Sequence, residues 1–344
     1  MLQESSGALW DHYDLAILDL DGVVYIGSAA VPGAPERLEK AAAAGMHLAF
    51  VTNNASRPPS VVASHLRELG VPARDEDVVT SAQAAARLLA ERLAPGSRVY
   101  VIGGQGLFDA LAERGLVVVQ DIDDEPHAVV SGYHPDLRWK TVSDGAILVR
   151  RGLPWVASNM DVSVPTEHGP GPGNGVLVGA VARFAGVEPV VAGKPRRPLF
   201  DETVRRVGGD RPLVVGDRLD TDIEGAHSSG LDSLLVLTGV TGLDELVAAG
   251  ERQRPTYLSS DLSGLGAAHP LPERTSDGWE LDGWRAVVED GELLVSGSGA
   301  VDDWWRVAVV AAWDHLDTTG DVVGTAKASA PGSVAADERD PAEG

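Results

Sequence analysis

The segment Leu15–Gly22 reads LAILDLDG and carries the most informative pattern in the chain. Four apolar residues lead to Asp19, and Asp21 follows two positions later. A short apolar run bounded by turn-forming residues is typical of a buried β-strand. On the turn that leaves such a strand, one carboxylate can attack phosphorus while the other holds the proton that a leaving oxygen needs, and both can share a hard cation. Taken alone, the pair is also compatible with a solvated turn.

The same alternation continues toward the C-terminus. The pattern predicts a helix over Pro35–Ala44, a strand over His47–Val51 that ends at Thr52–Asn54, and a second helix over Pro59–Leu69. Parallel strands joined by right-handed crossovers place a ligand site at their carboxyl ends. A hydroxyl and backbone amides at the end of the second strand could bind phosphoryl oxygens, although a helix cap would use the same residues.

Two later strand ends also carry charged residues. Lys194 follows the apolar run Val190–Ala192, and the acidic turn Gly216–Asp222 follows Leu213–Val215. We interpret both runs as strands that complete the first sheet. The lysine could neutralise a phosphoryl group together with the nucleophile, and the three carboxylates of the turn suit magnesium. A solvated lysine and a surface turn with a helix cap are the alternatives.

Taken together, four motifs in this order resemble those of the haloacid dehalogenase superfamily. They are Asp-x-Asp-Gly from Asp19, the strand-end threonine at Thr52, the strand-end lysine at Lys194, and Gly-Asp-x-x-x-Thr-Asp from Gly216. The long insertion between the second and third motifs, with Thr-Asn-Asn and Gly-Lys-Pro beside them, resembles the phosphatases of the NagD and 4-nitrophenylphosphatase type. The resemblance covers about Tyr13–Leu258.

The resemblance implies a magnesium-dependent phosphatase with an aspartyl-phosphate intermediate. Asp19 would be the nucleophile and a metal ligand. Asp21 would be the general acid and base and would bind the metal through its carbonyl. Asp217 would be the third protein ligand of Mg²⁺, and Asp222 would lie behind it, supporting the lysine or the metal's water molecules.

The resemblance also implies which residues bind the substrate. The phosphoryl group would be held by Thr52 and Lys194 and oriented by Asn53, with Asn54 beside them. In the insertion, the stiff loop around His168 would face the active site, so this histidine could contact the rest of the substrate; a solvent-exposed histidine is the alternative. Ser158–Asp161 resembles the cap's Thr-Asn-x-Asp motif, which could be purely architectural.

The fold class predicted from these patterns is α/β. We expect a three-layer Rossmann-like core over residues 10–80 and 186–258, with an inserted α/β cap of the C2 type over 81–185. Residues 259–319 contain five tryptophans and should form a small α+β domain that resembles a truncated acetyltransferase (GNAT-like) domain. It lacks a pyrophosphate-binding loop, so interaction or stabilisation is the better interpretation. Residues 320–344 are expected to be disordered.

Composition limits the partners. With 51 acidic and 28 basic residues, the net charge of −23 argues against nucleic acid or an anionic membrane as a ligand. The chain has no cysteine, no apolar run of membrane-spanning length and no signal-peptide pattern, so we expect a cytoplasmic protein. A small phosphorylated metabolite is the expected partner, and a homodimer through the cap is an expectation from the family.

The substrate is left open among several small monoesters. Resemblance to bacterial cap-bearing phosphatases with an acetyltransferase-like appendage favours glycerol 3-phosphate. Pyridoxal 5′-phosphate, a nucleoside monophosphate or a sugar phosphate are the alternatives. A phosphotransferase or mutase would keep the same carboxylates. A non-catalytic binding protein is a further alternative, although it would not need both Asp19 and Asp21.

Overall fold

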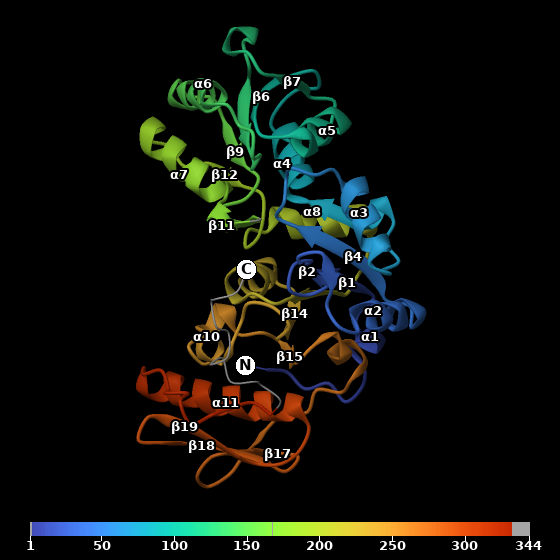
Figure 1. The fold of residues 1–344 in the computed structure, drawn as a ribbon, viewed down its shortest axis with the longest axis vertical. Helices are drawn as coiled ribbons and strands as arrows, with labels where there is room; N and C mark the ends of the chain where they lie inside the picture. The colour runs from blue at the N-terminus through green and yellow to red at the C-terminus, as the bar shows by residue number, and fades with distance from the viewer. Residues whose placement is uncertain (1, 167, 332–344) are drawn as a thin grey trace.

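The computed structural model describes residues 2–166 and 168–331 (Figure 1). At its centre is a six-stranded parallel sheet, in which Leu18 pairs with Phe50 on one side and with Val215 on the other. Its strands, in spatial order, are β15 (Tyr257–Ser259), β14 (Asp232–Val236), β13 (Pro212–Gly216), β1 (Leu15–Leu18), β4 (His47–Thr52) and β5 (Val78–Thr80).

Helices cover both faces of this sheet. Alternate side chains of β1 point to opposite faces, and each set is buried in an apolar cluster that the helices on its face complete. Leu18 packs with one cluster and Ile17 with the other, and both are fully buried. One face carries α1 (Leu9–His12), α2 (Ala34–Ala43) and α3 (Pro59–Glu68), and the other α4 (Ser81–Ala90), α8 (Pro198–Val207) and α9 (Glu224–Ser229). This is the predicted three-layer α/β core.

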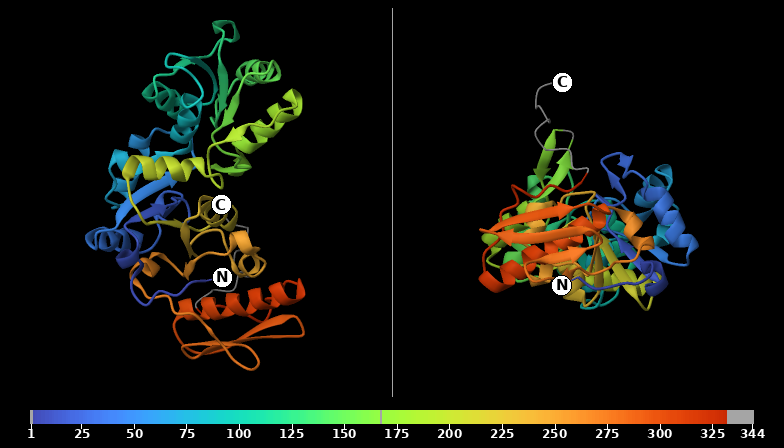
Figure 2. Two further views of the ribbon diagram at one scale, coloured as in Figure 1. Left: turned by 180° about the vertical axis from the view of Figure 1, so that it is seen from behind. Right: turned by 90° about the horizontal axis from the view of Figure 1, so that it is seen from below.

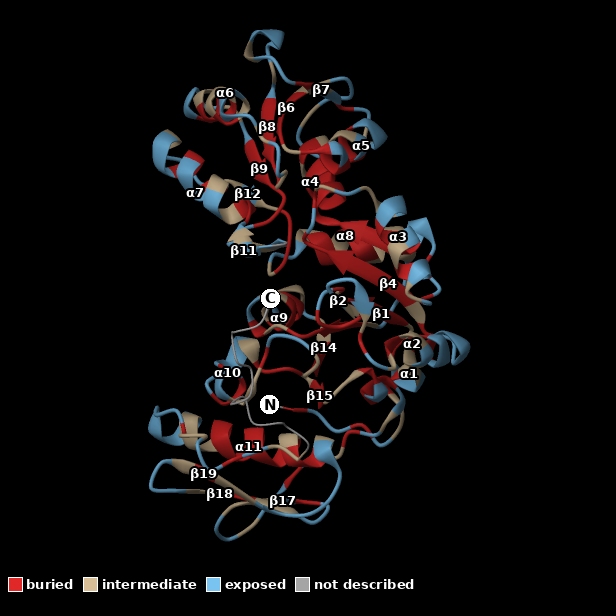
Figure 3. Cartoon of the chain, viewed as in Figure 1, coloured by how far each residue is buried: buried red, intermediate tan, exposed pale blue. Residues whose placement is uncertain are grey.

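A second parallel sheet forms the cap, and Figure 3 shows both parallel sheets largely buried. Its strands, in spatial order, are β12 (Val190–Val191), β9 (Trp155–Ala157), β8 (Ala128–Ser131), β6 (Arg98–Ile102) and β7 (Val117–Val119). Its other elements are α5 (Gln105–Glu113), α6 (Trp139–Arg150), α7 (Asn174–Ala185) and the hairpin of β10 (Ser163–Thr166) and β11 (Gly169–Pro172).

The cap sheet corrects one prediction. The run Val190–Val191 does not complete the core sheet, because β12 pairs in parallel with Val156 and Ala157 of β9. The chain therefore leaves the cap sheet only at Ala192, directly before Gly193 and Lys194. An apolar run of two residues can pair with any free sheet edge, so its sequence does not show which sheet it joins.

A buried ion cluster joins cap and core. Glu202 of α8 is fully buried, and its carboxylate contacts Arg87 of α4 at 3.2 Å, Arg114 after α5 at 2.5 Å and Arg206 at 2.5 Å. A buried carboxylate is tolerated only with such partners. Since Arg114 follows a cap helix and Glu202 belongs to the core, the cluster fixes the position of one against the other.

The C-terminal unit is a four-stranded antiparallel sheet covered by one long helix, α11 (Val301–Thr319). Its strands are β16 (Glu273–Arg274), β17 (Trp279–Leu281), β18 (Trp284–Glu289) and β19 (Glu292–Gly297). The helix lies between this sheet and the core (Figure 2). Remaining short elements are the hairpin of β2 (Tyr25–Ile26) and β3 (Ala29–Ala30), α10 (Leu243–Val247), and helical turns at Asp75–Asp77, Ile122–Asp124, Leu219–Ile223, Glu251–Gln253 and Leu262–Gly266.

The segment after Ser259 packs against the core, where Leu262 and Leu265 are buried. One further expectation needs correction. Residues 320–331 are not disordered: Val323 and Ala328 are buried against the C-terminal unit, and Gly324 forms a bridge with Glu292. The rest of the predicted tail, 332–344, lies outside the described residues. Within residues 2–166 and 168–331, no helix is long and apolar enough to cross a membrane.

Candidate active site

Three aspartates meet at the carboxyl edge of the core sheet. Asp19 directly follows β1, and Asp217 directly follows the neighbouring strand β13. The helical turn Leu219–Ile223 brings Asp222 back to the same place. One carboxylate oxygen from each of the three lies within 4.8 Å of the others. Such a concentration of negative charge requires cations nearby.

Lys194 supplies one of these charges. Its ammonium group is buried 2.6 Å from Oδ1 of Asp19 and 2.7 Å from Oδ1 of Asp222. Burial alone would lower the pKa of Lys194, but the two carboxylates outweigh it and hold this pKa above its usual range. The lysine therefore stays charged beside Asp19, where it also lowers the repulsion between that carboxylate and an incoming phosphate.

Asp217 has an unused oxygen that points to a second cation. Its Oδ2 accepts a hydrogen bond of 2.7 Å from the backbone amide of Val240, whereas its Oδ1 is buried without a hydrogen-bond partner. Burial, followed by the charge of Asp19, raises the pKa of Asp217 to about 6. An unsatisfied buried carboxylate oxygen next to two further carboxylates is the all-oxygen donor set that Mg²⁺ prefers. The residues present therefore fit a magnesium ion.

Protonation and metal binding should compete at Asp217. The pKa of Asp217 in the folded protein is about 6, above the ordinary 3.8. Protonated Asp217 therefore stabilises the metal-free fold fully below about pH 4, and this stabilisation is lost as the pH rises through 6. Mg²⁺ binds the deprotonated form. We expect the Mg²⁺-induced rise in Tm to be larger at about pH 7.5 than at about pH 5, as thermal unfolding would show. Asp217→Asn should remove most of the difference between the Tm shifts at the two pH values. Equal Tm shifts at both pH values in the parent protein would contradict the competition.

The carboxylate of Asp217 occupies space that is open only because two neighbouring residues are glycines. A methyl group added at Gly239, in the loop after β14, would overlap Oδ2 of Asp217, and one at Gly22 would lie 2.5 Å from the same oxygen. Gly22 also has a φ of 84°, a conformation that side chains disfavour. Both positions thus require glycine for the carboxylate to keep its place.

Gly239→Ala is therefore expected to weaken Mg²⁺ binding about tenfold, because the methyl group displaces Asp217. Titration calorimetry of the metal measures this. Gly179→Ala is the matched control, since Gly179 of α7 has open space at that position. Equal affinities in the two variants would show that Asp217 does not need this packing.

Asp21 stays accessible to solvent at the same edge. Desolvation by the surrounding protein, together with the charge of Asp19, raises the pKa of Asp21 to about 6. Its turn is fixed by a bridge to Tyr25 and by the amide of Gly22, which donates to the carbonyl of Tyr25 at 2.8 Å. A carboxyl with this pKa can hold or release a proton near neutral pH, as a general acid and base must.

In the loop after β4, the side chain of Asn53 makes its contacts within the protein. The side chain of Asn53 accepts from the backbone amide of Lys194 at 2.8 Å and donates to Asp161 at 2.9 Å and to the carbonyl of Lys194 at 3.2 Å. The side-chain amide is thus occupied by the protein. Its contacts hold the lysine segment and attach the cap loop to the site.

The neighbouring residues of this loop are only partly free. Oδ1 of Asn54 accepts from the amide and the hydroxyl of Ser56, so this side chain stabilises the loop. Thr52, almost fully buried at the end of β4, accepts from the amide of Asn54 at 3.0 Å. Its hydroxyl hydrogen has no acceptor among the described residues, and it can donate to a phosphoryl oxygen.

His168 is placed as in its solvent-exposed alternative, and Asp161 makes a contact between cap and core. His168 is exposed in the β10–β11 hairpin, and its recorded hydrogen bond is from its amide to Thr166, with no contact to the aspartate cluster among the described residues. Asp161, by contrast, reaches Asn53 directly. The signal for it was present in the Ser-Asn-x-Asp pattern, but its function could not be assigned without the partner.

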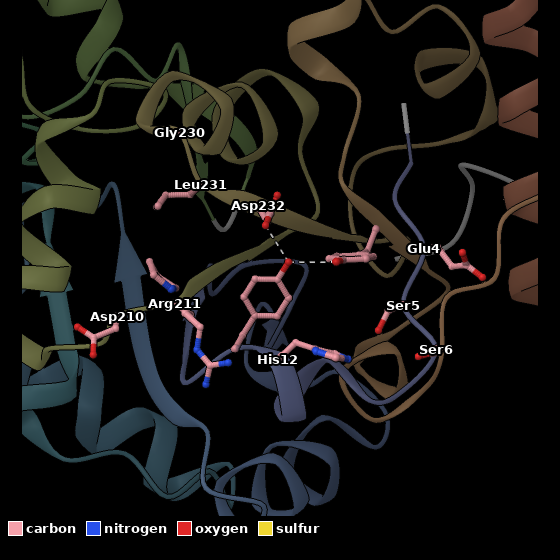
Figure 4. A pocket seen from close by; sticks show the side chains of 12 residues that line it. Glu4, Ser5, Ser6, His12, Asp210, Arg211, Gly230, Leu231 and Asp232 are labelled. Atoms are coloured by element: carbon pink, nitrogen blue, oxygen red, sulfur yellow. Dashed lines mark hydrogen bonds between the residues drawn. The ribbon is translucent and has the colours of Figure 1, made fainter.

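A cavity of about 560 Å³ lies at the opposite edge of the sheet (Figure 4). Its lining includes Tyr13, Arg211, Asp232 and Tyr257, which stand at the amino ends of β1, β13, β14 and β15. The hydroxyl of Tyr13 donates to Asp232 at 2.8 Å. This cavity is separated from Asp19 by the length of the strands and takes no part in the site described above.

Comparison with known proteins identifies the class. A family model of haloacid dehalogenase-like hydrolases matches residues 16–117, and a second model of such hydrolases matches residues 191–265. The chain belongs to the haloacid dehalogenase-like hydrolases, and it is a phosphatase of that family with Mg²⁺ as its cofactor. The predicted family, fold class and cofactor are confirmed.

Individual relatives are close. The chain is 45% identical over 297 residues to D-glycerol 3-phosphate phosphatase of Mycobacterium tuberculosis, covering 85% of this chain and 80% of that protein. It is 36% identical to acid sugar phosphatase of Staphylococcus aureus, covering 73% of this chain and 96% of that protein. The crystal structure of the glycerol phosphate phosphatase of Mycobacterium tuberculosis in complex with magnesium superposes with a TM-score of 0.81 at 41% identity, covering 90% and 92% of the two chains.

Proposed function

We propose that the chain hydrolyses glycerol 3-phosphate through an aspartyl-phosphate intermediate on Asp19. The observation that carries the mechanism is the buried contact of Asp19 with Lys194 beside Asp217 and Asp222. The substrate is supported by the extent of the similarity. The sequence match to the D-glycerol 3-phosphate phosphatase is 45% identical and covers 85% of this chain, whereas the match to the acid sugar phosphatase is 36% identical and covers 73%.

In the first step, a carboxylate oxygen of Asp19 attacks phosphorus. The new bond joins that oxygen to phosphorus, the bond from phosphorus to the substrate alcohol breaks, and the leaving oxygen takes the proton of Asp21. Lys194 stabilises the charge on the phosphoryl oxygens, and the hydroxyl of Thr52 donates to one of them. When bound, Mg²⁺ neutralises the charge that carboxylates and phosphate bring together.

In the second step, Asp21 removes a proton from water. The water oxygen bonds to phosphorus, the bond between phosphorus and Asp19 breaks, and inorganic phosphate leaves with the Asp19 carboxylate restored. The general base thereby returns to its protonated form. Its pKa of about 6 allows both transfers near neutral pH.

Contacts between cap and core favour a small substrate. Asn159 donates from its side chain to the carbonyl of Asn53 at 2.7 Å, and Asp161 accepts from the side chain of the same residue. These cap residues reach the loop that follows β4, so the cap covers the catalytic edge. Phosphoproteins would not fit, and small metabolites would.

The test is phosphate release with Mg²⁺ from glycerol 3-phosphate, a sugar phosphate, pyridoxal 5′-phosphate and a nucleoside monophosphate. We expect the largest kcat/KM for glycerol 3-phosphate and no release after chelation. A larger kcat/KM for another ester would change the substrate assignment and leave the proposed mechanism intact. Transfer to an added sugar in preference to water would instead indicate a phosphotransferase. No release from any ester by the folded protein would contradict the proposal.

Four predictions stay part of this proposal. They are the division into core, cap and C-terminal domain, with the end of the cap moved from residue 185 to Val191, a homodimer through the cap, a cytoplasmic location, and a resemblance of the C-terminal unit to an acetyltransferase-like domain. The antiparallel sheet with one covering helix supports the last of these. Size-exclusion chromatography with light scattering would test the dimer.

A further inference from the structure

The loop between β14 and α10 holds Asp217 by its backbone. The amide of Val240 donates to Oδ2 of Asp217 at 2.7 Å, and Thr241 donates to the carbonyl of Asp217 from its hydroxyl at 2.6 Å and from its amide at 3.2 Å. The hydroxyl of Thr238 donates to the carbonyl of Gly22 at 2.5 Å. The orientation of Asp217 therefore depends on where residues 237–242 lie.

This loop leads directly into α10, and the C-terminal unit packs against that helix. Trp313 of α11 is fully buried, and its indole nitrogen donates to the carbonyl of Leu246 at 2.8 Å. Leu246 shares an apolar cluster with Trp313, while Val247 is buried in the core of the C-terminal unit. Figure 1 shows α10 next to α11.

Arg254 makes the second connection. Its Nε donates to the carbonyl of Ala249 at 3.0 Å, and its two terminal nitrogens each contact Asp317 of α11 at 2.7 Å. Its guanidinium lies 5.2 Å from the ring centre of Trp313. Carbonyls at the end of a helix lack partners from a following turn. Trp313 and Arg254 bind two such groups: the carbonyl of Leu246, which also accepts from the amide of Ala249 at 3.2 Å, and the carbonyl of Ala249 just beyond α10.

We propose that α11 is a positioning element of the active site: through Trp313 and Arg254 it fixes α10, and α10 fixes the loop that orients Asp217. The tryptophan-rich unit then contributes to metal binding without touching metal or substrate. The inference rests on the proposed function, because it takes Asp217 as a ligand of Mg²⁺.

The experiment uses the full chain and two matched variants. Trp313→Phe removes the indole donor to Leu246, and Trp284→Phe removes a similar bond, in which the indole of Trp284 donates to the carbonyl of Ala300 at 2.9 Å within the C-terminal unit. Titration calorimetry without substrate gives the Kd of Mg²⁺. Hydrogen exchange reports the amides of Val240 and Thr241.

We expect Trp313→Phe to raise the Kd of Mg²⁺ about three- to tenfold, to speed exchange of both amides, and to keep kcat near the parent value at saturating Mg²⁺. Trp284→Phe should change none of these, even if both variants lose thermal stability. If Trp313→Phe does not fold, Asp317→Asn, at an exposed side chain, should move the same readouts in the same direction.

Unchanged Mg²⁺ affinity and unchanged amide exchange in folded Trp313→Phe would overturn the inference, as would equal shifts in Trp284→Phe. Failure of the parent protein to bind Mg²⁺ would instead overturn the proposed site. Since neither readout uses a substrate, a wrong substrate assignment would leave this test unaffected.

Discussion

Asp19→Asn is expected to lower kcat by about 10⁴-fold or more at saturating Mg²⁺ and substrate. An amide is far less nucleophilic than a carboxylate, and the substitution also removes the charge that contacts Lys194 at 2.6 Å. Stopped-time phosphate assays at high enzyme concentration measure the residual rate. The fold should survive, because the side chains are nearly equal in size and Asp19 lies at the end of its strand.

The matched control for this variant is Asp14→Asn. Asp14 stands at the other end of β1, where its carboxylate accepts from the amides of Asp210 and Arg211. Asp14→Asn should lose a little stability and keep the parent kcat. An Asp19→Asn enzyme with more than about a hundredth of the parent rate would show that another group attacks phosphorus.

Lys194→Met should lower kcat about 10³-fold and also destabilise the protein. The aliphatic chain is kept, but Asp19 and Asp222 lose the cation between them. Removing one partner of a buried ion pair destabilises a protein by about 3–5 kcal/mol. Protonation of Asp222 should offset part of this loss, because burial already raises the pKa of Asp222. Phosphate release and urea unfolding measure the two effects.

Lys140→Met is the control for the loss of a lysine from an ion pair. Lys140 pairs with Asp144 on the surface of the cap, and its side chain is 75% exposed, so its removal should change neither rate nor stability appreciably. If both lysine variants behaved alike, the buried position of Lys194 would not matter for catalysis.

The placement of the proposed catalytic groups was predictable because parallel strands end at a common edge. Asp19 and Asp217 each follow a strand and Thr52 is the last residue of one, and adjacent parallel strands bring such residues together whatever their separation in the chain. Lys194 was found by the same logic although its strand, β12, belongs to the cap sheet. Lys194 lies beside Asp19, but the sheet to which its strand belongs was predicted wrongly.

Backbone contacts and pairings between distant polar groups were not predictable. The amide of Val240 holds Asp217, and nothing in the side chains of that loop indicates it. Asn53 has the right position for a phosphate ligand, yet its side chain bonds to Lys194 and Asp161. Amides pair with any donor or acceptor in reach, so only the folded arrangement selects the partner.

The C-terminal segment shows the limit of composition. Residues 320–331 are rich in small and polar residues, which predicts disorder, but Val323 and Ala328 are buried against α11 and the antiparallel sheet. The burial of Val323 and Ala328 and the bridge of Gly324 to Glu292 anchor this segment, which its composition alone would class as disordered. An average over a window does not detect individual anchoring residues.

The most direct test of the account is to trap the covalent intermediate. The parent enzyme with Mg²⁺ and ³²P-labelled glycerol 3-phosphate is quenched in acid within one turnover, digested, and its labelled peptide sequenced by mass spectrometry. We predict one phosphoryl group on Asp19, released by hydroxylamine and absent from Asp19→Asn. Rapid phosphate release with no label on the protein, or label on Asp21 instead, would contradict the mechanism.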